Sequence, residues 1–428
     1  MSFTLSDLAV NGGPKARTRA NPPMYPGGLE IGEEEKREVI EVLDSKYLFR
    51  YYGPEDVPSK VKLLEQEYAG YIGTKHALAL NSCTSALITG LIAAGVEPGD
   101  EVIVPAYTFF ASCAAIVAAK ALPVICEVDA SLTMDPLDLE RKITSRTKAV
   151  LPVHMRGLPA KMDAIMEITR RRGLKVVEDA AQSNGGTYRG KKLGSFGDVG
   201  AFSLQYHKII TSGEGGIITT DDDLIYTRSQ AYHDVAACWR RDRFAPPDFE
   251  GEIFFGVNFR MSELHGAVAL AQFRKLDAIV DRMRKNKKRI KGQIESIPKL
   301  SFREITDPEG DTAVCLIFYL PDADSVRPVC EALQAEGVDA AGIYDSGIPD
   351  WHVYQHWTIL HGKMMPTKKG CPFDCPLAEP VPEYDPDACP QTAAYLGRTV
   401  HIDIPPQLSD ADCDEIAGAI QKVTSVLL

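Results

Sequence analysis

Three segments of this chain carry side chains that could together handle an amine and a phosphate. Lys208 lies in FSLQYHKIITSGEGG (202–216), after an apolar run and before a glycine-rich turn. A partly buried lysine has a lowered pKa, so its neutral amine can attack a carbonyl carbon and later move a proton. Lysines are more often solvated surface residues, and only the neighbouring segments favour the chemical interpretation.

A carboxylate ends the apolar run LKVVED. Asp179 is the last residue of this run and precedes Ala-Ala-Gln-Ser. An acid in this place can hold a pyridine nitrogen protonated, which lets the ring accept the electrons of a substrate carbanion. The same residue could instead serve as a helix N-cap.

The segment NSCTS (81–85) could bind a phosphate group, because it joins the run HALAL to the helical stretch TSALITGLIAAG. Backbone amides at a helix start, with Ser and Thr hydroxyls, form a cradle for an anion. An ordinary N-cap would use the same residues. Taken together, an amine, an acid for a pyridine nitrogen and phosphate donors are what a pyridoxal phosphate site requires.

The elements that must position these segments follow an alternating pattern. From about residue 75 to 221, short β-rich runs alternate with apolar-periodic helical stretches, which is typical of a parallel sheet covered by helices. Near-continuous apolar runs predict that both faces of the sheet are buried, so that ligands gather beyond the carboxyl ends of its strands. The predicted strands are 76–80, 101–106, 122–129, 148–154, 174–179, 198–204 and 215–221.

Two domains are expected, because 428 residues exceed what one hydrophobic core usually organises. After Asn258 the chain changes to one long amphipathic helical region, followed by a Pro- and charge-rich α+β stretch. We place an N-terminal arm at 1–30, a large cofactor-binding domain at 31–273 and a small C-terminal α+β domain at 274–428.

Composition argues against several classes of partner. The formal net charge of −12 weakens affinity for nucleic acid, and the basic run 282–291 is interpreted as a solvated helix face. The first residues lack an export signal and no later stretch has about 20 consecutive apolar residues, so we expect a cytoplasmic protein without a membrane span. The ten cysteines are scattered and expected to be reduced thiols. Cys371 and Cys375 alone are too few for a zinc site.

Read together, these residues resemble the DegT/DnrJ/EryC1/StrS family of sugar aminotransferases, which have the aspartate aminotransferase-like fold type I. The likeness extends over nearly the whole chain through GGLEIGEEEKREVIEVL, NSCTSAL, GDEVIVPAYTFFAS, PVHMRGLPAKMDAI, VVEDAAQSNGG, FSLQYHKIITSGEGG and GVNFRMSELHGAVALAQ. The resemblance implies pyridoxal 5'-phosphate as cofactor, a mostly parallel seven-stranded sheet, glutamate or glutamine as amino donor, and a keto or aldehyde sugar as acceptor. It also implies a homodimer with shared active sites.

The resemblance assigns a role to each matching residue. Lys208 matches the lysine that forms the Schiff base, and Asp179 matches the partner of the pyridine nitrogen. The phosphate loop departs from the Ser-Gly-Thr of many members, because Cys83 replaces the glycine and removes its backbone freedom. The further implied contacts are Gln182 near the phenolic oxygen, Phe109 against the ring, Ser203, Cys83 and Thr84 at the phosphate, and Asn258 at the phosphate of the neighbouring subunit's cofactor.

The acceptor is less sharply indicated. The C-terminal half looks most like transaminases that make 8-amino-3,8-dideoxy-octulosonate, whereas NGGPKARTRANPPMYPGG resembles members that act on cyclitols or aminohydroxybenzoate precursors. An octulosonate and glutamate both carry carboxylates, which need cationic or backbone donors. The candidate donors are His154, Arg156, His207 and Arg260, each of which could equally be structural.

Two rival functions are weighed against transamination. One is a pyridoxal phosphate sugar dehydratase, a reaction found in relatives where histidine replaces the Schiff-base lysine. Retention of Lys208 argues against it. The other is a non-catalytic regulatory protein that has kept the fold. The complete set Lys208, Asp179 and Gln182 disfavours that role.

Overall fold

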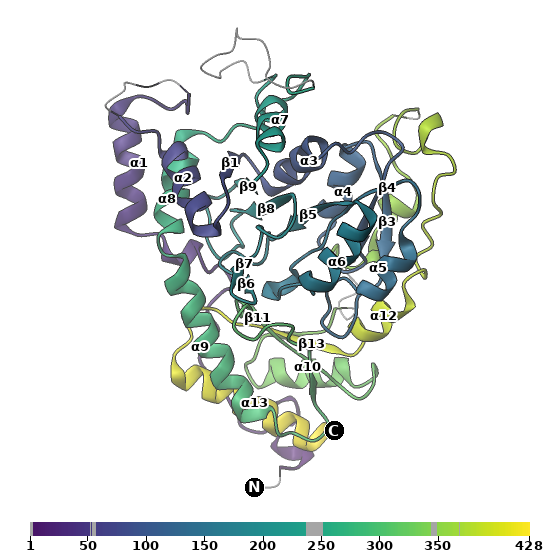
Figure 1. Ribbon diagram of the computed structural model, residues 1–428. Helices are drawn as coiled ribbons and strands as arrows, with labels where there is room; N and C mark the ends of the chain where they lie inside the picture. The colour runs from purple at the N-terminus through teal and green to yellow at the C-terminus, as the bar shows by residue number, and fades with distance from the viewer. Residues whose placement is uncertain (1–2, 52, 54–56, 237–250, 344–348, 368) are drawn as a thin grey trace.

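The computed structural model describes residues 3–51, 53, 57–236, 251–343, 349–367 and 369–428. Its centre is a seven-stranded sheet with helices packed on both faces (Figure 1). All seven predicted strands are present. They are β1 (His76–Leu80), β2 (Glu101–Pro105), β3 (Leu122–Cys126), β4 (Thr147–Val150), β5 (Lys175–Asp179), β8 (Val199–Ser203) and β9 (Gly216–Thr220).

The strand order is β1-β9-β8-β5-β4-β2-β3, with β9 antiparallel to both of its neighbours and the other pairs parallel. The expectation of a mostly parallel seven-stranded sheet is therefore confirmed. Strand β4 ends at Val150, earlier than predicted, since Pro152 has no N–H to donate to a ladder. Because β5 and β8 are parallel neighbours, Asp179 and Ser203 end up at the same edge of the sheet.

Helices cover the two faces of the sheet in separate groups. Apolar side chains of α5 (Pro136–Lys142) and α6 (Met162–Arg172) pack with inward residues of β2 to β5 in one core. The opposite face is covered by α3 (Cys83–Ala93), α4 (Ala111–Ala118) and α7 (Asp223–His233). The helices α1 (Glu33–Ser45), α2 (Lys60–Ile72) and α8 (Glu263–Phe273) lie together beside β1 (Figure 1).

A second, smaller core lies around a four-stranded antiparallel sheet of order β10-β11-β13-β12. Its helices α10 and α13 pack on this sheet, and α9 runs along α13 (Figure 1). The elements of this part are α9 (Leu276–Ile294), β10 (Ser301–Phe302), β11 (Cys315–Tyr319), α10 (Val326–Ala335), β12 (Ala340–Ala341), β13 (Thr399–Asp403) and α13 (Asp410–Leu427). The short hairpin β6 (Thr187–Tyr188) and β7 (Lys191–Lys192) and the helices α11 (Thr358–His361) and α12 (Pro390–Leu396) complete the list.

The long amphipathic region consists of two helices. Helix α8 ends at Phe273 and α9 begins at Leu276. The first half of α9 packs in the core of the large sheet, whereas Ile290 and Ile294 pack in the small core. Helix α9 therefore joins the two cores. Residues 353–396 leave the small sheet again, since Tyr354 and other apolar residues of this stretch pack in the large core.

The N-terminal segment connects both parts of the molecule. Leu8 is buried in the small core, and the Arg17 guanidinium reaches Asp412 of α13 at 2.5 Å. The chain then passes to the large sheet, where the Gly27 amide donates to the Lys208 carbonyl at 3.4 Å. The arm therefore starts on one core and ends beside the other.

The remaining composition-based expectations concern charges, thiols and membranes. In the basic run, Lys285, Lys287 and Arg289 form ion pairs with Asp410, Asp311 and Asp414, respectively. Among the residues described, the cysteines are free thiols and no cluster of three or more possible metal ligands occurs. Over the same residues, no helix has the length and apolar character needed to cross a membrane.

Candidate active site

A cavity of about 720 Å³ opens at the carboxyl ends of the central strands. Asp179 closes β5 and Ser203 closes β8, and both line it, together with the loop that follows β2. Of the sequence-predicted residues, the cavity brings together Cys83, Thr84, Phe109, Arg156, Asp179, Gln182, Ser203, His207 and Lys208.

In this cavity, Lys208 and Asp179 each influence the pKa of the other. Burial lowers the pKa of the Lys208 ammonium, while the neighbouring Cys83 and Asp179 act in the opposite direction. Burial raises the pKa of the Asp179 carboxyl, which the Ser112 hydroxyl and the charge of Lys208 partly offset. A lowered pKa increases the fraction of neutral amine at Lys208, and this is the form that attacks a carbonyl carbon.

Two hydrogen bonds fix the orientation of the Asp179 carboxylate. The Ser112 hydroxyl, on α4, donates to Oδ2 at 2.7 Å, and the Ala181 amide donates to Oδ1 at 3.0 Å. The Thr108 hydroxyl lies 2.8 Å from the Ser112 hydroxyl and extends the network to the loop after β2. These two donors hold the Asp179 carboxylate in one orientation. An acid that contacts a single atom of a ligand needs such a fixed orientation.

The start of α3 forms the anion-binding end of the cavity. The Ser82 hydroxyl accepts from the Ser85 amide at 3.1 Å, and Cys83 and Thr84 occupy the first helical turn. Gly216 of β9 lies directly against this turn, because a Cβ there would come within 2.2 Å of the Ser82 carbonyl oxygen. Backbone amides of a first helical turn are oriented to receive a phosphate.

Cys83 is accommodated without the freedom of a glycine. It is absent from the residues with positive φ and takes a helical conformation at the start of α3. The thiol is buried, and burial together with the charge of Asp179 raises its pKa. Cys83 is therefore a small protonated filler rather than a reactive thiolate.

Gln182 and Phe109 line the cavity in different ways. The Gln182 side-chain oxygen accepts from the Arg156 amide at 3.1 Å, so its orientation depends on the turn that carries Arg156. The Phe109 ring is 50% exposed and lies 5.2 Å from the His352 ring. An exposed aromatic ring in a cavity is a surface on which a flat ligand can stack.

The turn Met155–Gly157 presents Arg156 to the cavity. Arg156 has φ 53° and Gly157 has φ 83°, so two consecutive residues are left-handed. The Arg156 guanidinium contacts Asp403 at 2.7 Å and the Cys315 sulfur at 3.3 Å. Those two residues are paired in the register of β11 and β13, so Arg156 spans from the large sheet to the small one.

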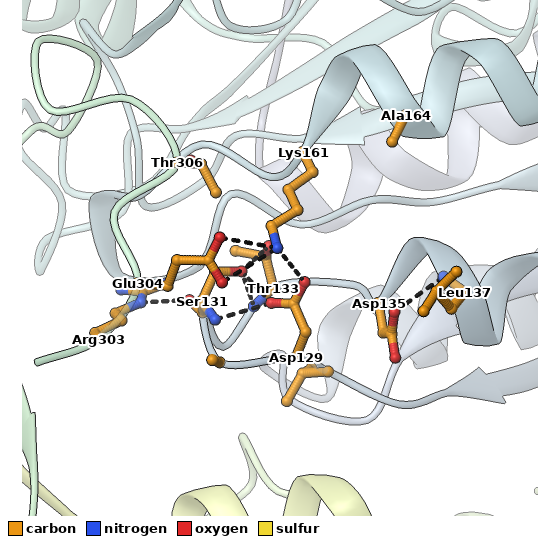
Figure 2. A network of polar contacts seen from close by, with 12 residues as sticks. Asp129, Ser131, Thr133, Asp135, Leu137, Lys161, Ala164, Arg303, Glu304 and Thr306 are labelled. Atoms are coloured by element: carbon orange, nitrogen blue, oxygen red, sulfur yellow. Dashed lines mark hydrogen bonds and ion pairs between the residues drawn. The ribbon is translucent and has the colours of Figure 1, made fainter. Parts of the chain in front are cut away.

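Residues that follow β10 contact this turn and the loop after β3, and Figure 2 shows Arg303 and Glu304 in this polar network. The buried Arg303 guanidinium donates to the Met155 carbonyl at 2.7 Å and to the Ser131 carbonyl at 2.5 Å. Nearby, the Lys161 ammonium lies between Asp129 at 2.9 Å and Glu304 at 3.0 Å. These contacts fix the large and small sheets at the point where Arg156 enters the cavity.

The N-terminal arm closes the side of the cavity next to Lys208. Met24, Tyr25 and Pro26 are lining residues, and the Tyr25 ring lies 4.9 Å from the His207 ring. His207 is exposed there. The candidate His207 therefore lies at the mouth of the cavity, beside the arm.

Three candidates lie outside the cavity wall. His154 is fully buried behind it, where Nδ1 accepts from the Ala160 amide and Nε2 lies 3.1 Å from Glu178. Arg260 pairs with Asp234, and Asn258 is exposed and accepts from the Arg260 amide. In this single chain, His154 and Arg260 serve as structural partners of buried carboxylates.

Several lining residues were missed by sequence reasoning. Ser112 lies in the quoted motif TFFAS, and its position one helical turn from Thr108 could have indicated it. Tyr25, His352 and Asp403 are distant in sequence from the catalytic segments; Tyr25 lies in NGGPKARTRANPPMYPGG and His352 follows Trp351 in the C-terminal half, but neither likeness indicated a contact with the cavity. They reach the cavity only through the packing of the arm and the small sheet.

Comparison with known proteins identifies the family. The model of the DegT/DnrJ/EryC1/StrS aminotransferase family matches residues 29–371. The chain belongs to this family. It is a pyridoxal phosphate-dependent aminotransferase, as the resemblance implied, and its fold is the fold type I of these enzymes.

Relatives with known names share much of the chain. It is 32% identical to the spore coat polysaccharide biosynthesis protein SpsC of Bacillus subtilis over 92% of this chain and 95% of that one. It is 33% identical to the L-glutamine:2-deoxy-scyllo-inosose aminotransferase of Streptomyces fradiae over 98% of both. Identity to the GDP-perosamine synthase of Caulobacter vibrioides is 41%, over 57% of this chain and 62% of that protein.

Solved structures agree with this assignment. DesV of S. venezuelae, in complex with a ketimine intermediate, is 27% identical with a TM-score of 0.77, over 95% of this chain and 99% of DesV. The 3-amino-5-hydroxybenzoic acid synthase is 25% identical with a TM-score of 0.74, over 96% and 99%.

The residues present fit pyridoxal phosphate. The partly buried Lys208 amine has a lowered pKa, two donors orient the Asp179 carboxylate in the same cavity, and the first turn of α3 offers amides for a phosphate. The lining thus contains a nucleophile for the aldehyde, an anion for the pyridine nitrogen and an anion cradle, and these are the three groups that such a cofactor needs.

Proposed function

We propose that this enzyme transfers an amino group from glutamate or glutamine to a keto or aldehyde carbon of a sugar acid, with 8-oxo-3-deoxy-octulosonate as the acceptor. When bound, pyridoxal phosphate supplies the electron sink for the substrate carbanion. Lys208 then removes and returns the proton at the reacting carbon, because its neutral amine is favoured by burial. Asp179 keeps the pyridine nitrogen protonated.

The choice of a sugar acid as acceptor rests on the guanidinium of Arg156. Only its Nη2 has partners within the described part of the chain, which leaves Nε and Nη1 for a ligand. A guanidinium binds a carboxylate through two parallel hydrogen bonds, which an ammonium cannot do. The amino donor and an octulosonate both carry a carboxylate that this fork can receive.

Half-reactions test the proposed function directly. The purified holoenzyme is offered glutamate, glutamine and alanine separately, and the aminated enzyme is then offered 8-oxo-3-deoxy-octulosonate. Mass spectrometry should detect 2-oxoglutarate in the first step when glutamate is the donor, and the 8-amino sugar acid in the second. Absence of an aminated product with an enzyme that has consumed glutamate would exclude this acceptor.

A variant of the guanidinium separates the role of Arg156 from general charge effects. Arg156→Met should lower kcat/KM for the octulosonate at least roughly tenfold, because a hydrogen bond to a charged group contributes about 1.5–3 kcal/mol. Arg172→Met is the matched control, since Arg172 is half exposed at the end of α6, away from the cavity lining. Equal activities of the two variants would contradict the assignment.

A cyclitol ketone is the second candidate acceptor. The alignment with the S. fradiae aminotransferase, whose name includes 2-deoxy-scyllo-inosose, covers 98% of both chains. An aminohydroxybenzoate precursor has similar support from the synthase of 3-amino-5-hydroxybenzoic acid. The same half-reactions with 2-deoxy-scyllo-inosose distinguish the cyclitol ketone from the sugar acid. This ketone has no carboxylate, so its amination should be much less sensitive to Arg156→Met.

We also propose that the enzyme works as a homodimer in which Asn258 contacts the phosphate of the neighbouring cofactor. Asn258 is exposed on this chain, and Phe255 beside it is 99% exposed. Mixing Lys208→Ala chains with Asn258→Ala chains should restore activity, because one site of the mixed dimer then has both native residues. Sedimentation as a monomer, or no recovery on mixing, would contradict shared sites.

A further inference from the structure

The stretch 350–353 brings His352 to the wall of the cavity, and the proposed function does not use this stretch. Its backbone is held to the loop after β2, where the Thr108 amide donates to the His352 carbonyl and the Phe110 amide donates to the Trp351 carbonyl, both at 2.9 Å. This stretch is thus fixed on the loop that also carries the ring of Phe109.

Asp350 fixes the imidazole of His352. One carboxylate oxygen, Oδ1, lies 2.8 Å from Nδ1 of the ring and accepts the His352 amide at 2.9 Å. Because a carboxylate oxygen only accepts, Nδ1 donates the hydrogen bond to Asp350, which leaves Nε2 as the nitrogen available to a ligand. Within the part of the chain that the structure describes, Nε2 has no hydrogen-bond partner, and the side chain is 35% exposed at the cavity wall.

The ring lies near the groups that would receive the polar end of an acceptor. Arg156 and Asp403 line the same cavity, and the charge of Arg156 reaches Asp350. The cavity lining therefore combines a cation, a carboxylate and an imidazole. This set of donors and acceptors matches a ligand with several hydroxyl groups, since each hydroxyl both donates and accepts.

We propose that His352, oriented by Asp350, is a specificity-determining contact that binds a hydroxyl group of the acceptor through Nε2. This proposal rests on the proposed transfer of an amino group to a hydroxylated acceptor. It names the side chain that recognises a hydroxyl group of that acceptor. Asp350 is a positioning residue, because it acts only through the ring. A site built to hydrogen-bond a hydroxyl discriminates strongly against ligands that lack it, since the polar group is then left unpaired.

The test compares the two half-reactions of the holoenzyme in His352→Leu. With glutamate, the rate of cofactor amination should stay within about twofold of the wild type, whereas kcat/KM for 8-oxo-3-deoxy-octulosonate should fall roughly tenfold to a hundredfold, mainly through KM. His352→Gln keeps a hydrogen-bonding group and should recover part of the loss. His265→Leu is the control, because His265 lies on α8 outside the cavity lining.

Asp350→Ala tests the positioning role. It should raise KM for the acceptor in the same direction as His352→Leu, with the glutamate half-reaction unchanged, because the ring loses its fixed tautomer and orientation. The double variant should be no worse than His352→Leu alone, since both changes remove one contact. An additive loss would contradict the role of Asp350.

The outcomes separate this proposal from the proposed function. If the wild-type enzyme aminates neither the octulosonate nor 2-deoxy-scyllo-inosose, the proposed function fails and this inference fails with it. If the wild type is active and His352→Leu matches it, only the assignment of His352 is wrong. Equal losses in both half-reactions would also overturn it, because His352 would then serve the cofactor or the amino donor.

Discussion

Burial shifts the pKa values of Asp179 and Lys208 in opposite directions. Leaving water disfavours the charged form of each, so the pKa of the carboxyl rises and that of the ammonium falls. Their mutual attraction partly offsets both shifts. The roles of these two residues depend on this balance.

The Ser112 hydroxyl should matter for the pH dependence of the enzyme. Its hydrogen bond lowers the pKa of Asp179, so Ser112→Ala should raise that pKa further. The ionised carboxylate then forms only at higher pH, and the acid limb of the kcat/KM profile should move upward. The control Ser183→Ala removes a buried hydroxyl that bonds to the His154 carbonyl instead. Coinciding acid limbs in the wild type and Ser112→Ala would argue against this coupling.

For Lys208 and Asp179, local sequence predicted a position in the cavity, whereas their chemical roles stay predictions. Lys208 and Asp179 each adjoin an apolar strand that the pattern revealed, so their placement followed from the strand order. The residue type of His154 suggested a hydrogen-bond donor for a substrate carboxylate. Its ring instead lies in hydrogen-bond contact with Glu178 and accepts from the Ala160 amide. Side-chain partners of this sort depend on tertiary packing, which a single sequence does not contain.

At the level of elements, the anion cradle depends on the close approach of β9 to the start of α3. Gly216→Ala should cost about 1–3 kcal/mol, because the new Cβ overlaps the backbone of Ser82 and Cys83 and must push the two elements apart. Affinity for pyridoxal phosphate should fall with it. Thermal unfolding and a cofactor titration measure both effects.

A second glycine provides the control for this change. Gly70→Ala places a Cβ in open space on the exposed face of α2, where it should be neutral or stabilise by up to about 1 kcal/mol. If Gly216→Ala had the same unfolding temperature and the same cofactor affinity as Gly70→Ala, the close approach of β9 to α3 would have no energetic consequence.

The strands were predicted more accurately than the helical linkage between the domains. Apolar periodicity over 262–297 predicted a long helical region with a boundary near residue 273, and the structure divides the region at Arg274 and Lys275. The Lys275 ammonium there bonds to the Glu30 carbonyl and Glu35. Partners from the N-terminal segment stabilise this break, and periodicity cannot reveal them.

At the scale of the whole molecule, the N-terminal arm ties the small core to the catalytic cavity. Arg17 is 1% exposed and pairs with Asp412, whereas Arg19 is half exposed beside the same carboxylates. Arg17→Ala should destabilise the fold by about 3 kcal/mol, because it removes the buried cation that Asp412 pairs with and leaves only the more distant, half-exposed Arg19. Arg19→Ala should cost under about 1 kcal/mol. Equal losses in chemical denaturation would contradict the anchoring role of Arg17.

The effect of Arg17 should depend on pH in one direction. Burial raises the pKa of Asp412, but hydrogen bonds from Ser409 and Arg17 outweigh it and hold the pKa below its ordinary value. A lowered pKa contributes stability above the ordinary Asp range, and that contribution is lost as the pH falls through the folded-state value. The stability gap between the wild type and Arg17→Ala should therefore narrow in acid.

The central claim is that the amine of Lys208 receives pyridoxal phosphate in the cavity that Asp179 shares. Reduction of the holoenzyme with borohydride, followed by peptide mass spectrometry, should place one cofactor on the peptide that contains Lys208. Lys192 is the best internal control, because burial lowers its pKa as well but it lies outside the cavity. Cofactor fixed on Lys192 or spread over several lysines, with equal labelling of Lys208→Ala, would contradict the account.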